Sequence, residues 1–173
     1  NTIVHFFLTR AVAELALLAV SEQRQPVTTL DHFWAEVREL RDLFKFEFFY
    51  PDTQEFEQQI DAELCREEPR WQSLLSERPD NARLIMNQLS PKLGHVALTI
   101  FAEAYSVGTD ILLRQADDEP LDEAMFIDRC MSYGRQAYLQ RRISSEASIG
   151  KLLYANAWKM LSSRGLIDQP ESR

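Results

Sequence analysis

The stretch that decides the fold covers residues 133–168 and reads YGRQAYLQRRISSEASIGKLLYANAWKMLSSRGLID. Two helical patterns meet in it at Ser144 and Ser145. After this pair, mainly apolar residues recur at the spacing of one helix face, with a single polar member: Ile149, Leu152, Leu153, Asn156 and Met160. We expect Ser144 or Ser145 to open the second helix, because a serine side chain there accepts a hydrogen bond from a free backbone N–H group.

The far end of the second helix also carries a chemical signal. Gly165 follows Arg164, and Leu166 follows the glycine. Glycine adopts the left-handed conformation at little cost, so the pattern predicts a Schellman ending with Leu166 folded back on the helix. The second helix is therefore expected to be bounded at both ends by specific residues.

The whole chain has the composition of a helical protein. It has 173 residues, 45% of them apolar, with five glycines and no Asn-Gly or Asp-Gly pair. Two-residue hairpin turns favour those pairs, and we find no alternating apolar pattern typical of strands. The sequence predicts an all-α fold, a single multi-helix domain of about six to eight helices spanning residues 1–173.

Residues 3–20, IVHFFLTRAVAELALLAV, are apolar on nearly every side. Arg10 and Glu14 lie near the middle, where each would cost about 3 kcal/mol at the centre of a bilayer. They are one helical turn apart and can pair. We expect a helix buried in protein rather than a membrane span, with both charges satisfied by polar partners. No other stretch is expected to reach transmembrane length.

Two D-x-x-E-like signals predict further helix starts. Thr28 with Asp31 and Asp52 with Glu55 each place a capping side chain three residues before an acid. Between them the aromatic segment KFEFFY, residues 45–50, fits either the end of a helix or a short strand. Its rings are expected to be core, with an outward-facing contact surface as the alternative.

Charge is distributed unevenly. The net charge of -8 disfavours binding to nucleic acid or anionic lipid. Residues 135–151 nevertheless hold four bases and one acid, the bases being Arg135, Arg141, Arg142 and Lys151. Arg135 and Arg142 are seven residues apart and would share a helix face. These bases form either a solvated helix end, where cations are favourable, or a contact with phosphate groups or a partner domain.

We find no residues arranged for catalysis or for holding a metal or cofactor. His5, His32 and His95 are far apart, and only His32 has an acid one turn away, at Glu36. No nucleophile elbow, phosphate-binding glycine loop or dinucleotide fingerprint is present. The two cysteines at 65 and 130 are expected to be small buried hydrophobes in a reducing setting. The predicted catalytic residues, metal ligands and cofactors are therefore none.

Several segments together resemble a known family. They are NTIVHFFLTRAVAELALL at the start, LFKFEFFYPDTQEFEQQIDAEL from residue 43, and GRQ, LQRRI, SEAS and RGLID in the last 40 residues. In this order they resemble the C-terminal region of bacterial membrane-bound glycerol-3-phosphate O-acyltransferases. None of them is a catalytic motif.

The resemblance implies a C-terminal helical accessory domain of a larger enzyme, with the catalytic domain upstream. That enzyme would move an acyl chain from acyl-CoA or acyl carrier protein to glycerol 3-phosphate, in phospholipid synthesis. It would sit peripherally on the cytoplasmic face of the membrane. The family uses a His and an Asp spaced as HxxxxD, but here Arg10, Val37 and Ile100 stand five residues after the three histidines. The chain opens on Asn1 within an apolar run, so we interpret it as a fragment.

A different class of protein fits the same helical pattern. The ligand-binding and dimerising half of a helical transcriptional regulator also packs helices around an apolar pocket and can be acidic. It predicts a DNA-binding segment upstream, whereas the acyltransferase interpretation predicts the HxxxxD motif there.

Overall fold

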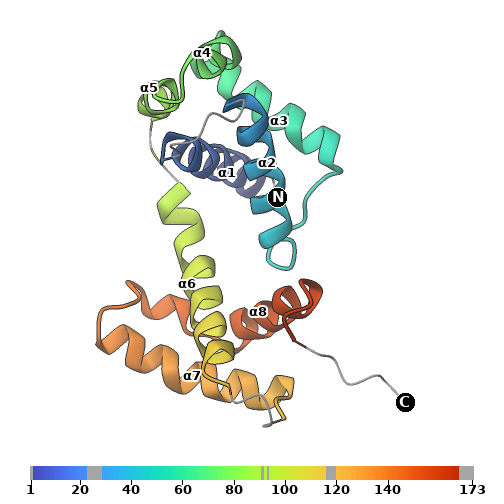
Figure 1. Cartoon of the computed structure of the whole chain (residues 1–173), viewed down its shortest axis with the longest axis vertical. Helices are drawn as coiled ribbons and strands as arrows, with labels where there is room; N and C mark the ends of the chain where they lie inside the picture. Colours follow the sequence, from blue (N-terminus) through green and yellow to red (C-terminus); the bar gives the residue numbers. More distant parts are fainter. Residues whose placement is uncertain (1, 23–28, 91, 93, 116–119, 168–173) are drawn as a thin grey trace. The chain divides into compact units, whose positions relative to one another are not determined.

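The computed structural model describes residues 2–22, 29–90, 92, 94–115 and 120–167 (Figure 1). Within these ranges the chain forms eight α-helices, one 3-10 helix and no strand. The predicted all-α class and number of helices are confirmed. By its internal contacts the chain divides into two compact units, Asn1–Leu98 and Thr99–Arg173, with one long helix running from the first into the second. The single domain stays a prediction.

The first unit is built around its N-terminal helix. α1 (Thr2–Glu22) packs against α2 (Thr29–Leu43), α3 (Thr53–Glu67) and α5 (Asn81–Gln88), while α4 (Trp71–Glu77) packs on α2 and α5. The buried side chains of α1 are mostly small or aliphatic, which lets the neighbouring helices approach closely: Leu8, Ala11, Val12, Ala13, Ala16, Leu17 and Val20. Figure 1 shows this helix, in dark blue, among the others of its unit.

The two central charges of α1, Arg10 and Glu14, are buried and paired, as predicted. Arg10 is 4% exposed and lies 3.7 Å from Glu14, 3.0 Å from Glu63 and 3.2 Å from Glu67. Glu14 also accepts a hydrogen bond from the backbone N–H of Gly94, at 2.5 Å. A Cβ at Gly94 would lie only 3.0 Å from that carboxylate, so glycine permits the close approach. These contacts tie α1 to α3 and to the start of the long helix.

The aromatic segment after α2 is neither helix nor strand. α2 ends at Leu43, and the chain then makes a turn through residue 48. The rings are divided between core and surface, since Phe44 is buried and Phe49 is 93% exposed. Asp52 caps α3 as expected, because its carboxylate accepts the N–H of Glu55 at 2.8 Å. The cap expected at Thr28 lies outside the described residues.

The second unit contains most of α6 (Gly94–Leu113), then α7 (Glu123–Leu139), η1 (Glu146–Ser148) and α8 (Lys151–Ser163). α7 and α8 pack against each other, and the ring centre of Phe126 in α7 lies 5.2 Å from that of Trp158 in α8, with the two rings tilted by 55°. Gly108 of α6 lies against both helices, since a Cβ there would contact Phe126 and Ala157. Phe126, Cys130 and Ala137 of α7 are buried.

Two details of α8 differ from the prediction. The helix begins at Lys151, and Ser145 instead caps the 3-10 turn by accepting the N–H of Ala147. Ile149 lies in extended backbone before the helix, so the start of the pattern fails, while its later members Asn156 and Met160 are buried as predicted. The buried side chains of the helix are Tyr154, Asn156, Ala157, Trp158, Met160 and Leu161, while Leu152 is 74% exposed.

The Schellman ending of α8 is confirmed in its backbone. Gly165 has φ +68°, its N–H bonds to Ser162 O at 3.0 Å, and Leu166 N–H bonds to Leu161 O at 3.0 Å. The side chain of Leu166 does not fold back, because it is 61% exposed, and the next residue, Ile167, is buried instead.

One expectation about membrane-spanning length was wrong. Within α6, Val96–Leu113 is long and apolar enough to cross a membrane by length and composition, and a third of that window, 33%, is buried. The window contains Glu103 and Asp110, and both carboxylates make polar contacts with α7 or the segment after it. Each would cost about 3 kcal/mol near the bilayer centre. These contacts favour α6 as a core helix of the second unit.

Candidate functional site

The basic segment of the sequence begins at the end of α7. The last turn of α7 ends in a second Schellman motif. The N–H of Arg141 bonds to Tyr138 O at 2.9 Å, and the N–H of Arg142 bonds to Ala137 O at 2.8 Å. Arg141 occupies the position that usually holds glycine and has φ +57°. Since α7 ends at Leu139, Arg142 lies outside the helix and does not continue the face of Arg135, contrary to the prediction.

Arg142 is held by a polar cluster centred on Tyr133. Its guanidinium donates to the Tyr133 hydroxyl at 2.6 Å, lies 4.7 Å from the ring centre, and is 3.5 Å from the carboxylate of Asp110. Arg114 makes a matching pair of contacts, at 3.0 Å to the hydroxyl and 4.8 Å to the ring. The hydroxyl in turn donates to Asp110 at 2.7 Å. Two cations, one ring and one carboxylate thus connect α6, α7 and the turn after α7.

The other three predicted site residues are not part of this cluster. Arg135, Arg141 and Lys151 are exposed, and their side chains make no hydrogen bond or ion pair with another residue that the structure describes. Lys151 is the first residue of α8, as expected of its position early in the second helix. The structure therefore separates Arg142, which has internal partners, from three cations that face solvent.

Residues 144–148, which include the SEAS segment, bind a carboxylate from α6. Glu103 accepts hydrogen bonds from the backbone N–H of Ser144 at 2.6 Å, from that of Ser145 at 3.4 Å, and from the buried hydroxyl of Ser148. Partial burial alone would raise the pKa of Glu103, but the serine hydrogen bonds outweigh it and hold the pKa below its usual value. No pattern in the sequence predicted the contact between Glu103 and these serines, which lie more than 40 positions away.

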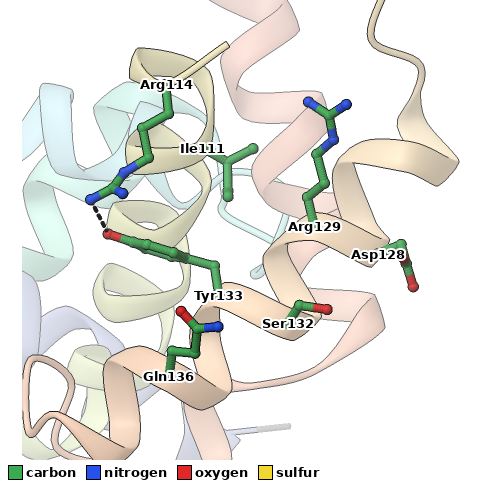
Figure 2. A pocket seen from close by; sticks show the side chains of 7 residues that line it. All are labelled: Ile111, Arg114, Asp128, Arg129, Ser132, Tyr133 and Gln136. Carbon is green, nitrogen blue, oxygen red and sulfur yellow. Dashed lines mark hydrogen bonds between the residues drawn. The ribbon is translucent and has the colours of Figure 1, made fainter.

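A shallow pocket of about 340 Å³ lies beside the Tyr133 cluster (Figure 2). The side chains that line it are mixed in charge: Ile111, Arg114, Asp128, Arg129, Ser132, Tyr133 and Gln136. Figure 2 shows Arg114 reaching the Tyr133 hydroxyl on one side, with Arg129 on the other side. Arg129 donates to Gln115 at 2.5 Å. The lining does not form a pair of nucleophile and base.

The described residues contain no group of three His, Cys, Asp or Glu side chains placed to hold a metal. His32 and Glu36 lie 3.6 Å apart, and the side chains of His5 and His95 lie outside the described part. Cys130 is buried, and this burial raises the pKa of its thiol to about 12, as expected for a packed cysteine. Cys65 is half-buried; burial and Asp61 raise its pKa.

Comparison with known protein families shows which family the chain belongs to. The model of the glycerol-3-phosphate acyltransferase C-terminal region matches residues 1–170. The chain belongs to this family. No solved structure matches it.

Curated relatives support the same assignment. Proteins named "Putative acyltransferase plsB1" from Mycobacterium bovis and from two strains of Mycobacterium tuberculosis are each 32% identical to this glycerol-3-phosphate acyltransferase C-terminal region. The match covers 97% of the chain and 27% of each relative. The chain thus spans about a quarter of the length of these curated relatives. None of these comparisons supports the transcriptional-regulator alternative.

Proposed function

We propose that this chain is the helical accessory domain of a glycerol-3-phosphate 1-O-acyltransferase. The whole enzyme would transfer an acyl chain from acyl-CoA or acyl carrier protein to glycerol 3-phosphate, the entry step of phospholipid synthesis. The observation that carries the proposal is the family match over residues 1–170. The relatives' names and their greater length support a catalytic domain upstream, which would be the main partner of this chain.

The role proposed for the chain is structural support rather than chemistry. None of the three histidines is followed five residues later by Asp, so the chain lacks the family's acid-base pair. Its conspicuous buried or clustered polar groups, Arg10, Glu103 and Tyr133, have internal partners that hold helices together. Helices held together by such internal contacts suit a domain that braces a neighbour.

A labelled-acyl transfer assay tests this division of roles. The isolated chain is expected to form no acylated glycerol 3-phosphate, whereas the full-length protein forms it. Removing the region that corresponds to this chain is expected to abolish activity or lower it at least tenfold. A truncated protein with full activity would show that the accessory role is wrong, and activity in the isolated chain would overturn the assignment of chemistry to the upstream domain.

We further propose that the protein attaches peripherally to the cytoplasmic face of the membrane. The burial of α1 and the contacts of Glu103 and Asp110 in α6 support attachment without a span in this chain. Cell fractionation tests this placement for the chain expressed alone. Membrane-bound chain is expected to be released by high salt or alkaline carbonate, and extraction by detergent alone would contradict it.

A further inference from the structure

The connection between α7 and α8 brings the two helix ends together. A Cβ at Gly134 would lie 3.5 Å from Ile149 and would overlap the hydroxyl of Tyr154. The last turns of α7 therefore lie beside the start of α8, with the turn through η1 at the same end of the pair. Residues 135–141 and 151–152 thus share one end of the second unit, which we call the basic end.

Three apolar or aromatic side chains of the basic end face solvent. Leu139 is 81% exposed, Leu152 is 74% exposed and Tyr138 is 38% exposed. Burying leucine in an apolar medium is worth about 1.5–3 kcal/mol relative to full exposure, so two such residues at one end provide a driving force for docking. Tyrosine suits the boundary between lipid and water because its ring is apolar and its hydroxyl is polar.

The same end carries the unpartnered cations. Arg135, Arg141 and Lys151 are exposed, while Glu146 is the one acid within residues 135–151. Arg142 is not counted, since Tyr133 and Asp110 hold its guanidinium. In a chain of net charge -8 this end is locally positive. Each basic residue near an anionic membrane surface contributes about 1 kcal/mol of attraction, and the rest of the chain is repelled.

The backbone at Arg141 is a separate observation. Its φ of +57° lies in the left-handed region, where a side chain costs roughly 1–2 kcal/mol relative to glycine. The Arg141 side chain makes no hydrogen bond or ion pair with a described residue that would offset this cost. Strained positions of this kind concentrate at functional sites. The Arg141 side chain is exposed in the turn that follows α7.

We propose that the basic end is a docking surface for an anionic lipid bilayer, with Arg135, Arg141 and Lys151 at the lipid phosphates and Leu139, Leu152 and Tyr138 at the acyl boundary. This inference rests on the peripheral attachment proposed above and assigns it to particular residues. Exposed leucines at the same end as exposed cations match a surface that offers phosphates above an apolar layer. A protein partner, such as the catalytic domain, is the outcome that the tests below would reveal instead.

Vesicle co-sedimentation of the 173-residue chain tests the charges. Binding is expected on vesicles of phosphatidylglycerol and phosphatidylcholine, with little on phosphatidylcholine alone. The triple change Arg135→Gln, Arg141→Gln and Lys151→Gln is expected to weaken binding roughly a hundredfold, from about 1 kcal/mol for each charge. A matched variant removes three exposed arginines of the first unit, Arg70→Gln, Arg78→Gln and Arg83→Gln, and is expected to bind at least as well as the parent chain.

The apolar contribution has its own matched pair. Leu139→Ser with Leu152→Ser is expected to weaken vesicle binding at least tenfold, whereas Leu84→Ser with Leu113→Ser, also at exposed leucines, leaves it unchanged. Equal losses in the two pairs would mean nonspecific apolar adsorption and would overturn the proposal. Circular dichroism and thermal melting confirm that each variant is folded.

Arg141 allows stability and binding to be separated. Arg141→Gly relieves the positive-φ strain, so its urea midpoint is expected to rise while its affinity for anionic vesicles falls by about fivefold. Arg141→Lys is expected to retain most of the binding. If Arg141→Gly binds as well as the parent chain, the outward guanidinium has no role at a membrane.

Activity of the full-length protein in detergent micelles distinguishes the two proposals. The triple Gln variant is expected to keep its acyltransferase activity there, because micelles do not require bilayer docking. If the triple Gln variant loses activity in micelles but binds vesicles as the parent does, the partner of the basic end is the catalytic domain and not lipid. A full-length protein without acyltransferase activity would refute the proposed function. The vesicle-binding experiments on the chain would still decide whether the basic end binds lipid.

Discussion

The hydroxyl of Tyr154 in α8 lies directly over Gly134 in α7, where an added Cβ would overlap that oxygen. The hydroxyl is buried and has no hydrogen-bond partner among the described residues. Burial, and secondarily Cys130, raises the pKa of Tyr154 to about 12. Glycine in the GRQ segment therefore sets the distance between the two helices.

Gly134→Ala is expected to lower the free energy of unfolding by about 1–3 kcal/mol, the usual cost of overpacking. Tyr154→Phe removes the oxygen that the new Cβ would meet, and it also removes an unsatisfied buried hydroxyl, so alone it is expected to be neutral or stabilising. When Tyr154→Phe is already present, Gly134→Ala should cost less, because the oxygen that the new Cβ would overlap is absent. The preference of about 1 kcal/mol for alanine over glycine in a helix is then no longer outweighed by that contact. Urea unfolding of the parent chain, the two single variants and the double variant measures this coupling. Additive effects would show that the oxygen is not the obstacle.

The hydrogen bonds of Glu103 predict a dependence of stability on pH. Because the pKa is lower in the folded chain than its ordinary value of 4.5, the folded state favours the carboxylate. The stabilisation is fully present above the unfolded pKa and is lost as the pH falls through the lower, folded pKa. Urea midpoints between pH 7 and pH 3 measure the loss.

A substitution separates Glu103 from the other acids of the chain. Glu103→Gln is expected to lower stability at pH 7 by about 1–3 kcal/mol and to flatten the acid dependence, since an amide accepts weaker hydrogen bonds. Glu146→Gln is the control, because this exposed acid lies in the segment that Glu103 binds and is not itself one of the donors to Glu103. Equal effects of the two changes would contradict the assignment to Glu103.

Helical periodicity predicted buried residues correctly where the residues counted lie within one helix. Asn156 and Met160 of α8 are buried as the pattern predicts, and Asp52 caps α3. The same method failed for Leu152, because Ile149, where the pattern was started, precedes the helix in extended backbone. Periodicity gives a face only when every residue counted is helical.

The polar contacts of the second unit were not predictable from local patterns. Glu103 meets Ser144 from 41 positions away, and Asp110 meets Tyr133 from 23 positions away. Such pairs arise from the packing of α6 on α7, which no single segment specifies. The sequence did locate the cations Arg135, Arg141, Arg142 and Lys151, but only the structure separates Arg142, held by Tyr133, from the three that face solvent.

Arg141 and Gly165, the left-handed residues in the described part of the chain, predict opposite responses to substitution. Gly165 has φ +68° and open space around the position of a Cβ, so Gly165→Ala meets no steric contact and only the backbone strain remains. We expect a loss of about 1 kcal/mol. A thermal melt of this variant measures the strain directly, and an unchanged melting temperature would show that α8 ends without a left-handed residue in solution.

The buried cluster around Arg10 provides the largest expected effect. Arg10→Met removes the cation shared by Glu14, Glu63 and Glu67, leaving buried carboxylates without it, and is expected to cost about 3–5 kcal/mol. Arg38→Met breaks the exposed pair with Glu57, at 2.8 Å, and is expected to cost less than about 1 kcal/mol. Urea unfolding compares the two variants at pH 7. Similar losses would mean that the charges of α1 are solvated in solution, which would remove the reason for regarding this helix as the buried centre of the first unit.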